Sequence, residues 1–146
     1  MDNSLEKRIQ RLEDIEAIKK LQATYGHFVD WGWNGKQPQD VTHFFTENAT
    51  FECVAFGMSA KGNKQISEML TKGSTFTIAQ HSFTNPIIDV DGDNATGKWL
   101  LWVGVNGGEA NIVFESEDVK YVRTSEGWKI QGIELFVAQM LKNPQS

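Results

Sequence analysis

Apolar residues recur at three- or four-residue intervals from Leu5 to about Val29, with Glu, Lys and Arg between them. This spacing predicts a long amphipathic helix, or two helices in series. The stretch 31–38 has the residues of a loop, and Pro38 suits the first turn of a short second helix that runs through Phe45.

The middle of the chain predicts one strand and one further helix. Residues 50–54 have the composition of a strand, and residues 62–70 place Ile66, Met69 and Leu70 on one side of a helix.

The second half of the chain is rich in β-forming residues. Short turn sequences, Asp-Gly-Asp, Asn-Gly-Gly and Ser-Glu-Gly, divide it into runs that are typical of hairpins. The runs cover roughly residues 76–90, 94–105, 110–124 and 127–139. Helices first and an antiparallel meander second indicate an α+β fold, with the apolar face of the sheet packed on the helices. Long strands twist and curl, and a concave sheet with few helices to fill it leaves a cavity.

Composition and charge narrow the classes of function. The 146 residues are typical of a single domain spanning 1–146, and the net charge of −5 comes without any stripe of Lys and Arg. We therefore expect neither nucleic acid nor a membrane surface as a partner. The charged N-terminus lacks an apolar run that would direct export, and the single Cys53 forms no internal disulfide, so we expect a cytoplasmic protein.

No pattern of metal or nucleotide ligands is present in the sequence. His27, His43 and His81 are isolated from one another, and residues 106–108 form a hairpin tip rather than a phosphate loop that opens a helix. We expect no metal and no other cofactor.

Several stretches carry a resemblance to a known family. They are YGHFVD at 25–30, FFTENATF at 44–51, HSFTNPIIDVDGDNA at 81–95, and YVR at 121–123 before GWKI at 127–130. In this order they resemble the SnoaL-like branch of the NTF2-like family, a cone-shaped α+β fold, over roughly residues 8–139. The family includes dehydratases, isomerases, cyclases and ligand-binding modules, so the resemblance implies a fold but not one function.

Within that family, the bile acid 7α-dehydratase and the scytalone dehydratases use a Tyr, an Asp and a His inside the cone to eliminate water without a metal. Tyr25, Asp30 and His81 match this pattern, whereas the second His of the scytalone enzymes has no counterpart after His81. The resemblance implies that His81 is the base, that Asp30 orients its ring, and that Tyr25 donates to a substrate oxygen.

Each of these residues also has a purely structural interpretation. His81 is equally typical of a half-buried sheet histidine, Tyr25 of a core tyrosine, and Asp30 of a solvated aspartate at a helix end. Five helical residues place Asp30 about 140° around the axis from Tyr25. Both can face one pocket only if the helix ends or loosens near Val29.

Four further residues are candidates for substrate binding. Asn85 shares the face of His81 if the strand is regular, and either binds a substrate oxygen or satisfies an edge before Pro86. Aromatic residues in strands are usually core, but some line the pocket if there is one, and our candidates are Phe51, Trp99 and Trp102.

The sequence thus predicts a cofactor-independent dehydratase or isomerase acting on a small hydrophobic molecule, alicyclic, steroid-like or polyketide-like. Two alternatives stay open: a non-catalytic ligand-binding or assembly domain, and a polyketide-cyclase or ketosteroid-isomerase type of enzyme with an Asp base. Members of the SnoaL-like family commonly pair through the outer face of the sheet, and this resemblance, together with apolar residues at both parities of 99–103, implies a homodimer or homotrimer.

Overall fold

The computed structural model describes residues 4–32, 35–72 and 77–142. Its helices precede a long-stranded meander, which confirms the predicted α+β architecture. In chain order the elements are α1 (Leu5–Val29), the 3-10 turn η2 (Thr42–Phe44), β1 (Phe45–Cys53), the 3-10 turn η3 (Val54–Phe56), β2 (Met58–Lys61), α2 (Asn63–Thr71), β3 (Ile78–Asp91), β4 (Asn94–Asn106), β5 (Ala110–Thr124) and β6 (Gly127–Lys142).

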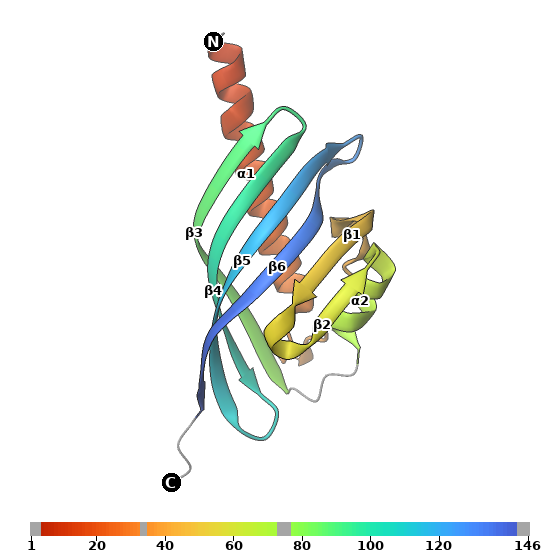
Figure 1. The fold of residues 1–146 in the computed structure, drawn as a ribbon, viewed down its shortest axis with the longest axis vertical. Helices are drawn as coiled ribbons and strands as arrows, with labels where there is room; N and C mark the ends of the chain where they lie inside the picture. Colours follow the sequence, from red (N-terminus) through yellow and green to blue (C-terminus); the bar gives the residue numbers. More distant parts are fainter. Residues whose placement is uncertain (1–3, 33–34, 73–76, 143–146) are drawn as a thin grey trace.

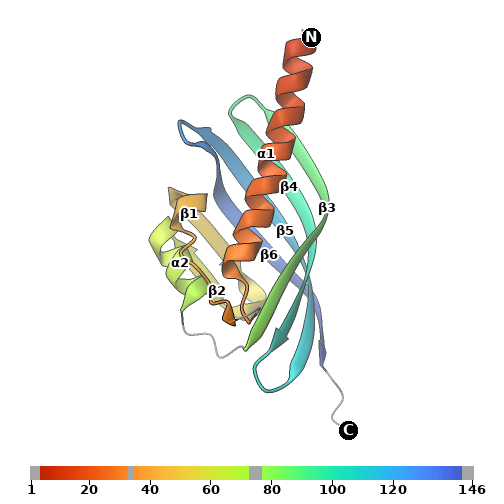
Figure 2. The same ribbon diagram turned by 180° about the vertical axis from the view of Figure 1, so that it is seen from behind.

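The strands form one curved sheet in the order β2-β1-β6-β5-β4-β3 (Figure 1). Strands β3 to β6 are an antiparallel meander, as the turn sequences predict. Strand β1 departs from that pattern, because it pairs parallel to β6 and antiparallel to β2. Figure 2 shows α1 lying across the concave face of the sheet, with α2 beside β1 and β2.

Helix α1 is the long helix that the apolar spacing predicts. Its C-terminal half buries Ile18, Tyr25 and Val29, whereas its N-terminal turns extend beyond the sheet (Figure 2). The helix ends at Val29, and Asp30 has extended backbone angles of φ −72° and ψ 151°. No described helix combines the length and apolar character needed to cross a membrane.

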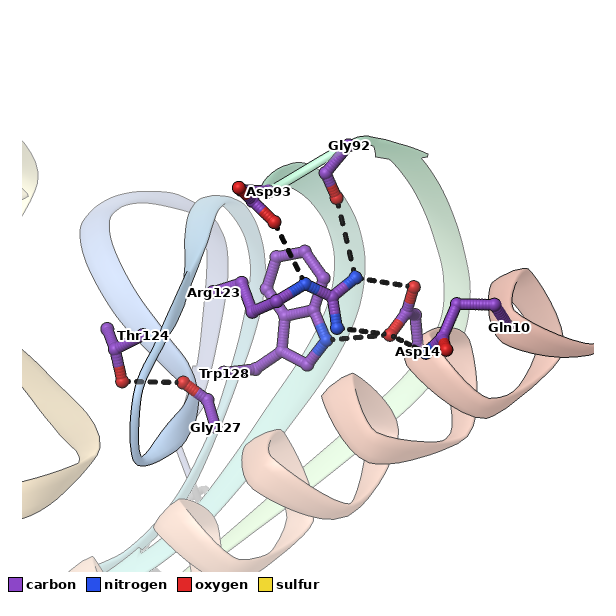
Figure 3. A network of polar contacts seen from close by, with 8 residues as sticks. All are labelled: Gln10, Asp14, Gly92, Asp93, Arg123, Thr124, Gly127 and Trp128. Atoms are coloured by element: carbon purple, nitrogen blue, oxygen red, sulfur yellow. Dashed lines mark hydrogen bonds and ion pairs between the residues drawn. The ribbon is translucent and has the colours of Figure 1, made fainter. Parts of the chain in front are cut away.

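A polar cluster joins the exposed half of α1 to the β3–β4 and β5–β6 hairpins (Figure 3). The Arg123 guanidinium donates to both carboxylate oxygens of Asp14 at 2.8 Å, and the Trp128 indole Nε1–H donates to the same carboxylate at 3.2 Å. Arg123 also donates to Asp93 and lies 4.6 Å from the centre of the Trp128 ring. The bidentate pair with Arg123 holds the pKa of Asp14 below its usual value.

The prediction of a short second helix that runs through Phe45 is wrong. Only the 3-10 turn η2 forms there, and Phe45 instead begins strand β1, which is longer than the predicted 50–54. Pairing with β6 decides the conformation, since Phe45 lies opposite Ile130 in the parallel ladder. The helix predicted at 62–70 is confirmed as α2. Strand β2 is not predicted by the sequence pattern.

A few predicted positions cannot be compared. Trp33 and Asn34 of the loop, Gly73 after the predicted helix, and Phe76 at the start of the first β-rich run lie outside the described residues.

Candidate functional site

A cavity of about 380 Å³ lies between the C-terminal half of α1, the β1–β2–α2 unit and the concave face of the sheet. Its volume falls in the range of small-molecule pockets, roughly 300–1,000 Å³. Most of the lining is apolar and includes Phe51, Met58, Met69, Leu101, Val103 and Met140. Polar side chains also reach it, namely those of Tyr25, Trp31, His81, Asn111, Glu115 and Glu117.

His81 on β3 and Asp30 just after α1 lie in direct contact. The chain beyond the helix pairs with β3 through an isolated bridge, in which the Trp31 N–H donates to the Ala79 carbonyl at 2.9 Å. This bridge places Asp30 beside His81. One carboxylate oxygen of Asp30 then accepts two hydrogen bonds of 2.9 Å, from the backbone N–H and from ring Nδ1 of His81.

This geometry determines which ring nitrogen is basic. A carboxylate oxygen only accepts hydrogen bonds, so the proton of the neutral imidazole lies on Nδ1 of His81, and Nε2 retains its lone pair. Asp30 is 4% exposed and therefore shielded from water, whereas the His81 side chain is 25% exposed and lines the cavity. The pair presents a basic nitrogen in a largely apolar site.

Tyr25 reaches the same cavity from the last turns of α1. Its ring is 3% exposed and packs edge-on against Phe45, and its hydroxyl has no protein hydrogen-bond partner among the described residues. Burial, with smaller contributions from the charges of Glu117 and Glu115, raises the pKa of Tyr25 well above its ordinary value. The hydroxyl is therefore a hydrogen-bond donor that keeps its proton.

The predicted wall residues have different outcomes. Phe51 lines the cavity as expected. Trp99 is buried in the core on the concave side of the sheet and does not line the cavity, so it is not a wall residue. The interpretation of Trp102 as a pocket residue is wrong, because β4 turns Leu101 and Val103 inward and leaves Trp102 on the outer face, 39% exposed.

Asn85 does not share the face of His81. The pairing of β3 with β4 shifts between Thr84 and Ile87, and Asn85 lies in this irregularity with a φ of 53°. The extra residue breaks the alternation of side chains, so Asn85 is exposed and lies outside the cavity lining.

Two buried carboxyl groups on β5, those of Glu115 and Glu117, were missed by the sequence analysis. They are 7% and 3% exposed and line the cavity. Burial raises the pKa of Glu115 to about 7 and that of Glu117 to about 8, where the charge of Glu115 adds to the effect. The sequence did carry a signal, since both glutamates alternate in step with Val113 and Val119.

A chain of buried hydrogen bonds supports Glu117 from behind. The Trp99 indole N–H donates to the Tyr121 hydroxyl at 2.9 Å, which donates to the Gln22 amide oxygen at 2.8 Å. The Gln22 amide nitrogen donates to Glu117 at 2.9 Å. A side chain at Gly97 would come within 2.9 Å of the Tyr121 ring, so the close approach needs glycine there.

The other histidines are separate from the site. His27 and His43 are both exposed and do not line the cavity. Within residues 4–32, 35–72 and 77–142, no three His, Cys, Asp or Glu side chains gather closely enough to hold a metal ion.

Comparison with known families assigns the chain. The sequence profile of the SnoaL-like domain matches residues 10–134. The chain therefore belongs to the SnoaL-like family, and the resemblance noted in the sequence is confirmed. No curated protein matches the chain.

Solved structures with the same fold share little sequence with it. A hexachlorocyclohexane dehydrochlorinase, LinA type 2, superposes with a TM-score of 0.82 at 16% identity over 95% of each chain. A protein from Novosphingobium aromaticivorans, provisionally named a scytalone dehydratase, gives 0.78 at 19% identity over 93% of this chain and 91% of its own. An NTF2-like protein with a cystatin-like fold from the same organism gives 0.75 at 22% identity, over 95% and 93%. These likenesses establish the NTF2-like fold.

Proposed function

We propose that the protein is a cofactor-independent dehydratase that removes water from a small, mainly apolar molecule with an acidic C–H bond next to a carbonyl. The observation that carries this proposal is the His81–Asp30 pair at the wall of a cavity that Tyr25 also lines. Two of the solved relatives carry names of elimination enzymes, a dehydrochlorinase and a dehydratase, which agrees with the proposal.

The proposed reaction begins with proton abstraction. Nε2 of His81 takes the proton from the carbon next to the carbonyl, and Asp30 stabilises the imidazolium that forms. The Tyr25 hydroxyl donates a hydrogen bond to the carbonyl oxygen, where negative charge develops. The apolar lining keeps water away from these groups and strengthens both interactions.

A carboxylate-base isomerase is the second candidate, because carboxyl groups also face the cavity. No aspartate lines the cavity among the described residues, so this role would fall to Glu115 or Glu117 rather than to the Asp base considered from the sequence. The two candidates differ in their response to pH. A glutamate base gains activity as pH rises through about 8, the pKa of Glu117, whereas the His81 reaction does not depend on an ionised glutamate.

We also propose that the protein self-associates through the convex face of its sheet. Apolar side chains are exposed there on three neighbouring strands, namely Leu100, Trp102, Ile112, Phe114 and Phe136. Trp102 and Phe114 lie opposite each other in the β4–β5 ladder. Contiguous apolar surface of this kind is uncommon on monomers.

A substrate screen tests the enzymatic proposal. The protein is incubated with uncharged alicyclic and polyketide-like 3-hydroxy ketones, and formation of the conjugated enone is followed by ultraviolet absorbance. Because the proposed chemistry requires no metal, a chelator is present throughout. Tight binding of these ketones with neither dehydration nor exchange of the α-proton for deuterium would favour a non-catalytic binding module.

A further inference from the structure

Glu115 and Glu117 have almost nothing nearby to stabilise a negative charge. No Lys or Arg lines the cavity among the described residues. Glu117 accepts one hydrogen bond, from Gln22, and the carboxyl of Glu115 accepts none from any described residue. A buried carboxylate without a cation or several donors is costly, so such groups bind a proton instead.

The hydrogen bonds behind Glu117 run in one direction only. Trp99 can only donate, so the Tyr121 oxygen accepts from it and the Tyr121 proton goes to the Gln22 amide oxygen. Gln22 must then present its NH₂ group to Oε2 of Glu117. With Oε2 engaged as an acceptor, the proton of the neutral carboxyl group belongs on Oε1.

The two glutamates lie on β5 and His81 lies on β3, and all three line one cavity. His81 pairs with Val103 on β4, which pairs with Val113 on β5. Glu115 is the next inward residue after Val113, so its backbone lies two strands across and two residues along from His81, roughly 12 Å away at the usual strand spacings. His81 and the two glutamates therefore line the same cavity from separate strands.

We propose that Glu115 and Glu117 form the proton-donating end of the cavity, which hydrogen-bonds an oxygen of an uncharged, mainly apolar ligand and protonates the hydroxyl group that leaves in the dehydration. The second half of this statement rests on the proposed function, whereas the first half does not. The structure thereby assigns a ligand class, neutral molecules with an oxygen acceptor, and excludes carboxylate groups from this end.

His81 and one glutamic acid account for every proton and bond that changes in the dehydration. Nε2 of His81 takes the α-proton, and the electron pair of that C–H bond forms the new C=C bond as the C–O bond breaks. The leaving hydroxyl group takes the proton of a glutamic acid and departs as water. The enzyme is left with an imidazolium and a carboxylate, and transfer of one proton between them through solvent restores the starting state.

The pH response follows from the groups around the carboxyl pair. Tyr25 faces the cavity from α1 and His81 from β3, while the lining residues of α2, β1, β2, β4 and β6 are all apolar. Burial disfavours ionisation of both glutamates, the charge of Glu115 further disfavours that of Glu117, and the neutral Tyr25 adds no charge. As pH rises through about 7 to about 8, the two carboxyl groups lose their protons and become anions that repel an oxygen acceptor.

Binding of a neutral ketone tests the ligand class. The probe is trans-2-decalone, an uncharged bicyclic ketone, and its dissociation constant is measured by calorimetry at pH 6 and pH 9.5. We expect binding at pH 6 that weakens about tenfold or more at pH 9.5, as loss of one hydrogen bond predicts. The double variant Glu115→Gln/Glu117→Gln keeps neutral donors, so its affinity should be the same at both values.

The opposite results are equally informative. No binding at pH 6, or equal affinity of the wild-type protein at both pH values, would overturn the proposal. His27→Ala is the matched control, because His27 is exposed and does not line the cavity, and this variant should show the same weakening as the wild type. Melting curves establish that all variants are folded.

A second measurement needs no ligand. Protein labelled with ¹³C at the glutamate carboxyl carbons is titrated by NMR, and the single variants Glu115→Gln and Glu117→Gln assign the two resonances. Two carboxyl groups that titrate between pH 6 and pH 9 support the proposal, and two that are ionised by pH 6 contradict it. The two proposals can fail separately. If both glutamates keep their protons and the protein binds the ketone, but no 3-hydroxy ketone is dehydrated, then the proposed function is wrong and the proposed proton-donating role of the glutamates is supported.

Discussion

Asp30 binds His81 twice through one carboxylate oxygen, which accepts 2.9 Å hydrogen bonds from both the backbone N–H and the ring Nδ1. The backbone contact fixes the carboxylate relative to β3, and the ring contact then fixes the imidazole relative to the carboxylate. The position of the base is therefore determined by the fold rather than by a free side-chain rotation.

Asp30→Asn should disturb this arrangement without changing its shape. The amide oxygen can still accept from both the backbone N–H and the ring Nδ1–H of His81, so the tautomer is kept, but the variant removes the charge that stabilises the imidazolium. We expect the ¹⁵N chemical shifts of the His81 ring to stay those of the tautomer with its proton on Nδ1, and dehydration to slow by about 10²-fold or more. Asp89→Asn, at an exposed position on β3, is the control and should leave both unchanged. An unaltered dehydration rate in Asp30→Asn would contradict the role given to Asp30.

Glu117→Gln should change the dependence of stability on pH. The folded-state pKa of Glu117, about 8, lies above its ordinary value of 4.5, so the folded protein binds the extra proton between these values. The stabilising contribution of this raised pKa is fully present below about pH 4.5 and is lost as pH rises through about 8. The glutamine variant lacks this loss. Its melting temperature should match the wild type near pH 5 and exceed it at pH 9, whereas Glu134→Gln, at an exposed site on β6, should follow the wild type at both.

Asp14→Asn tests the cluster that joins α1 to the hairpins. The variant removes the charge that Arg123 contacts through two hydrogen bonds, so we expect a loss of about 1.5–3 kcal/mol in the free energy of unfolding. The matched control is Asp118→Asn, which breaks an exposed pair with Lys98 and should cost less than about 1 kcal/mol. Because the pKa of Asp14 is lowered, its contribution is present above pH 3.8 and is lost as pH falls further. Equal losses in the two variants, measured by urea unfolding at pH 7, would refute the importance of the cluster.

The convex face of the sheet should mediate self-association. Light scattering at micromolar concentration and physiological salt is expected to show a dimer or trimer, and Trp102→Glu should shift it toward the monomer because it places a charge in the apolar patch. A monomeric wild-type protein under these conditions counts against the proposal.

The long elements could be predicted from the sequence because each carries its own periodic signal. The spacing of apolar residues defines α1, and strong turn sequences separate β3 to β6. The segment before β1 has no such signal of its own. Its aromatic residues suit a helix or a strand, and only the pairing of Phe45 with β6, distant in sequence, decides between them.

The site was predictable only where a local rule fixed the direction of a side chain. The end of α1 near Val29 allowed Asp30 to reach His81, as the helical geometry required. In contrast, the apolar run 99–103 has no alternation, so the sequence could not tell that Trp102 faces outward. Glutamates in strands are usually exposed, which hides the inward position of Glu115 until the ladder with β4 is known.

The most direct test of the account compares the dehydration rates of wild type, His81→Ala and His27→Ala on one 3-hydroxy ketone that the wild type converts. His81→Ala removes the base and should lower kcat/KM by about 10²–10⁴-fold with an unchanged melting temperature. His27→Ala removes an exposed imidazole from α1 and should retain the wild-type rate. A His81→Ala variant that is folded and dehydrates the ketone at nearly the wild-type rate would contradict the assignment of His81 as the base, and with it the proposed mechanism.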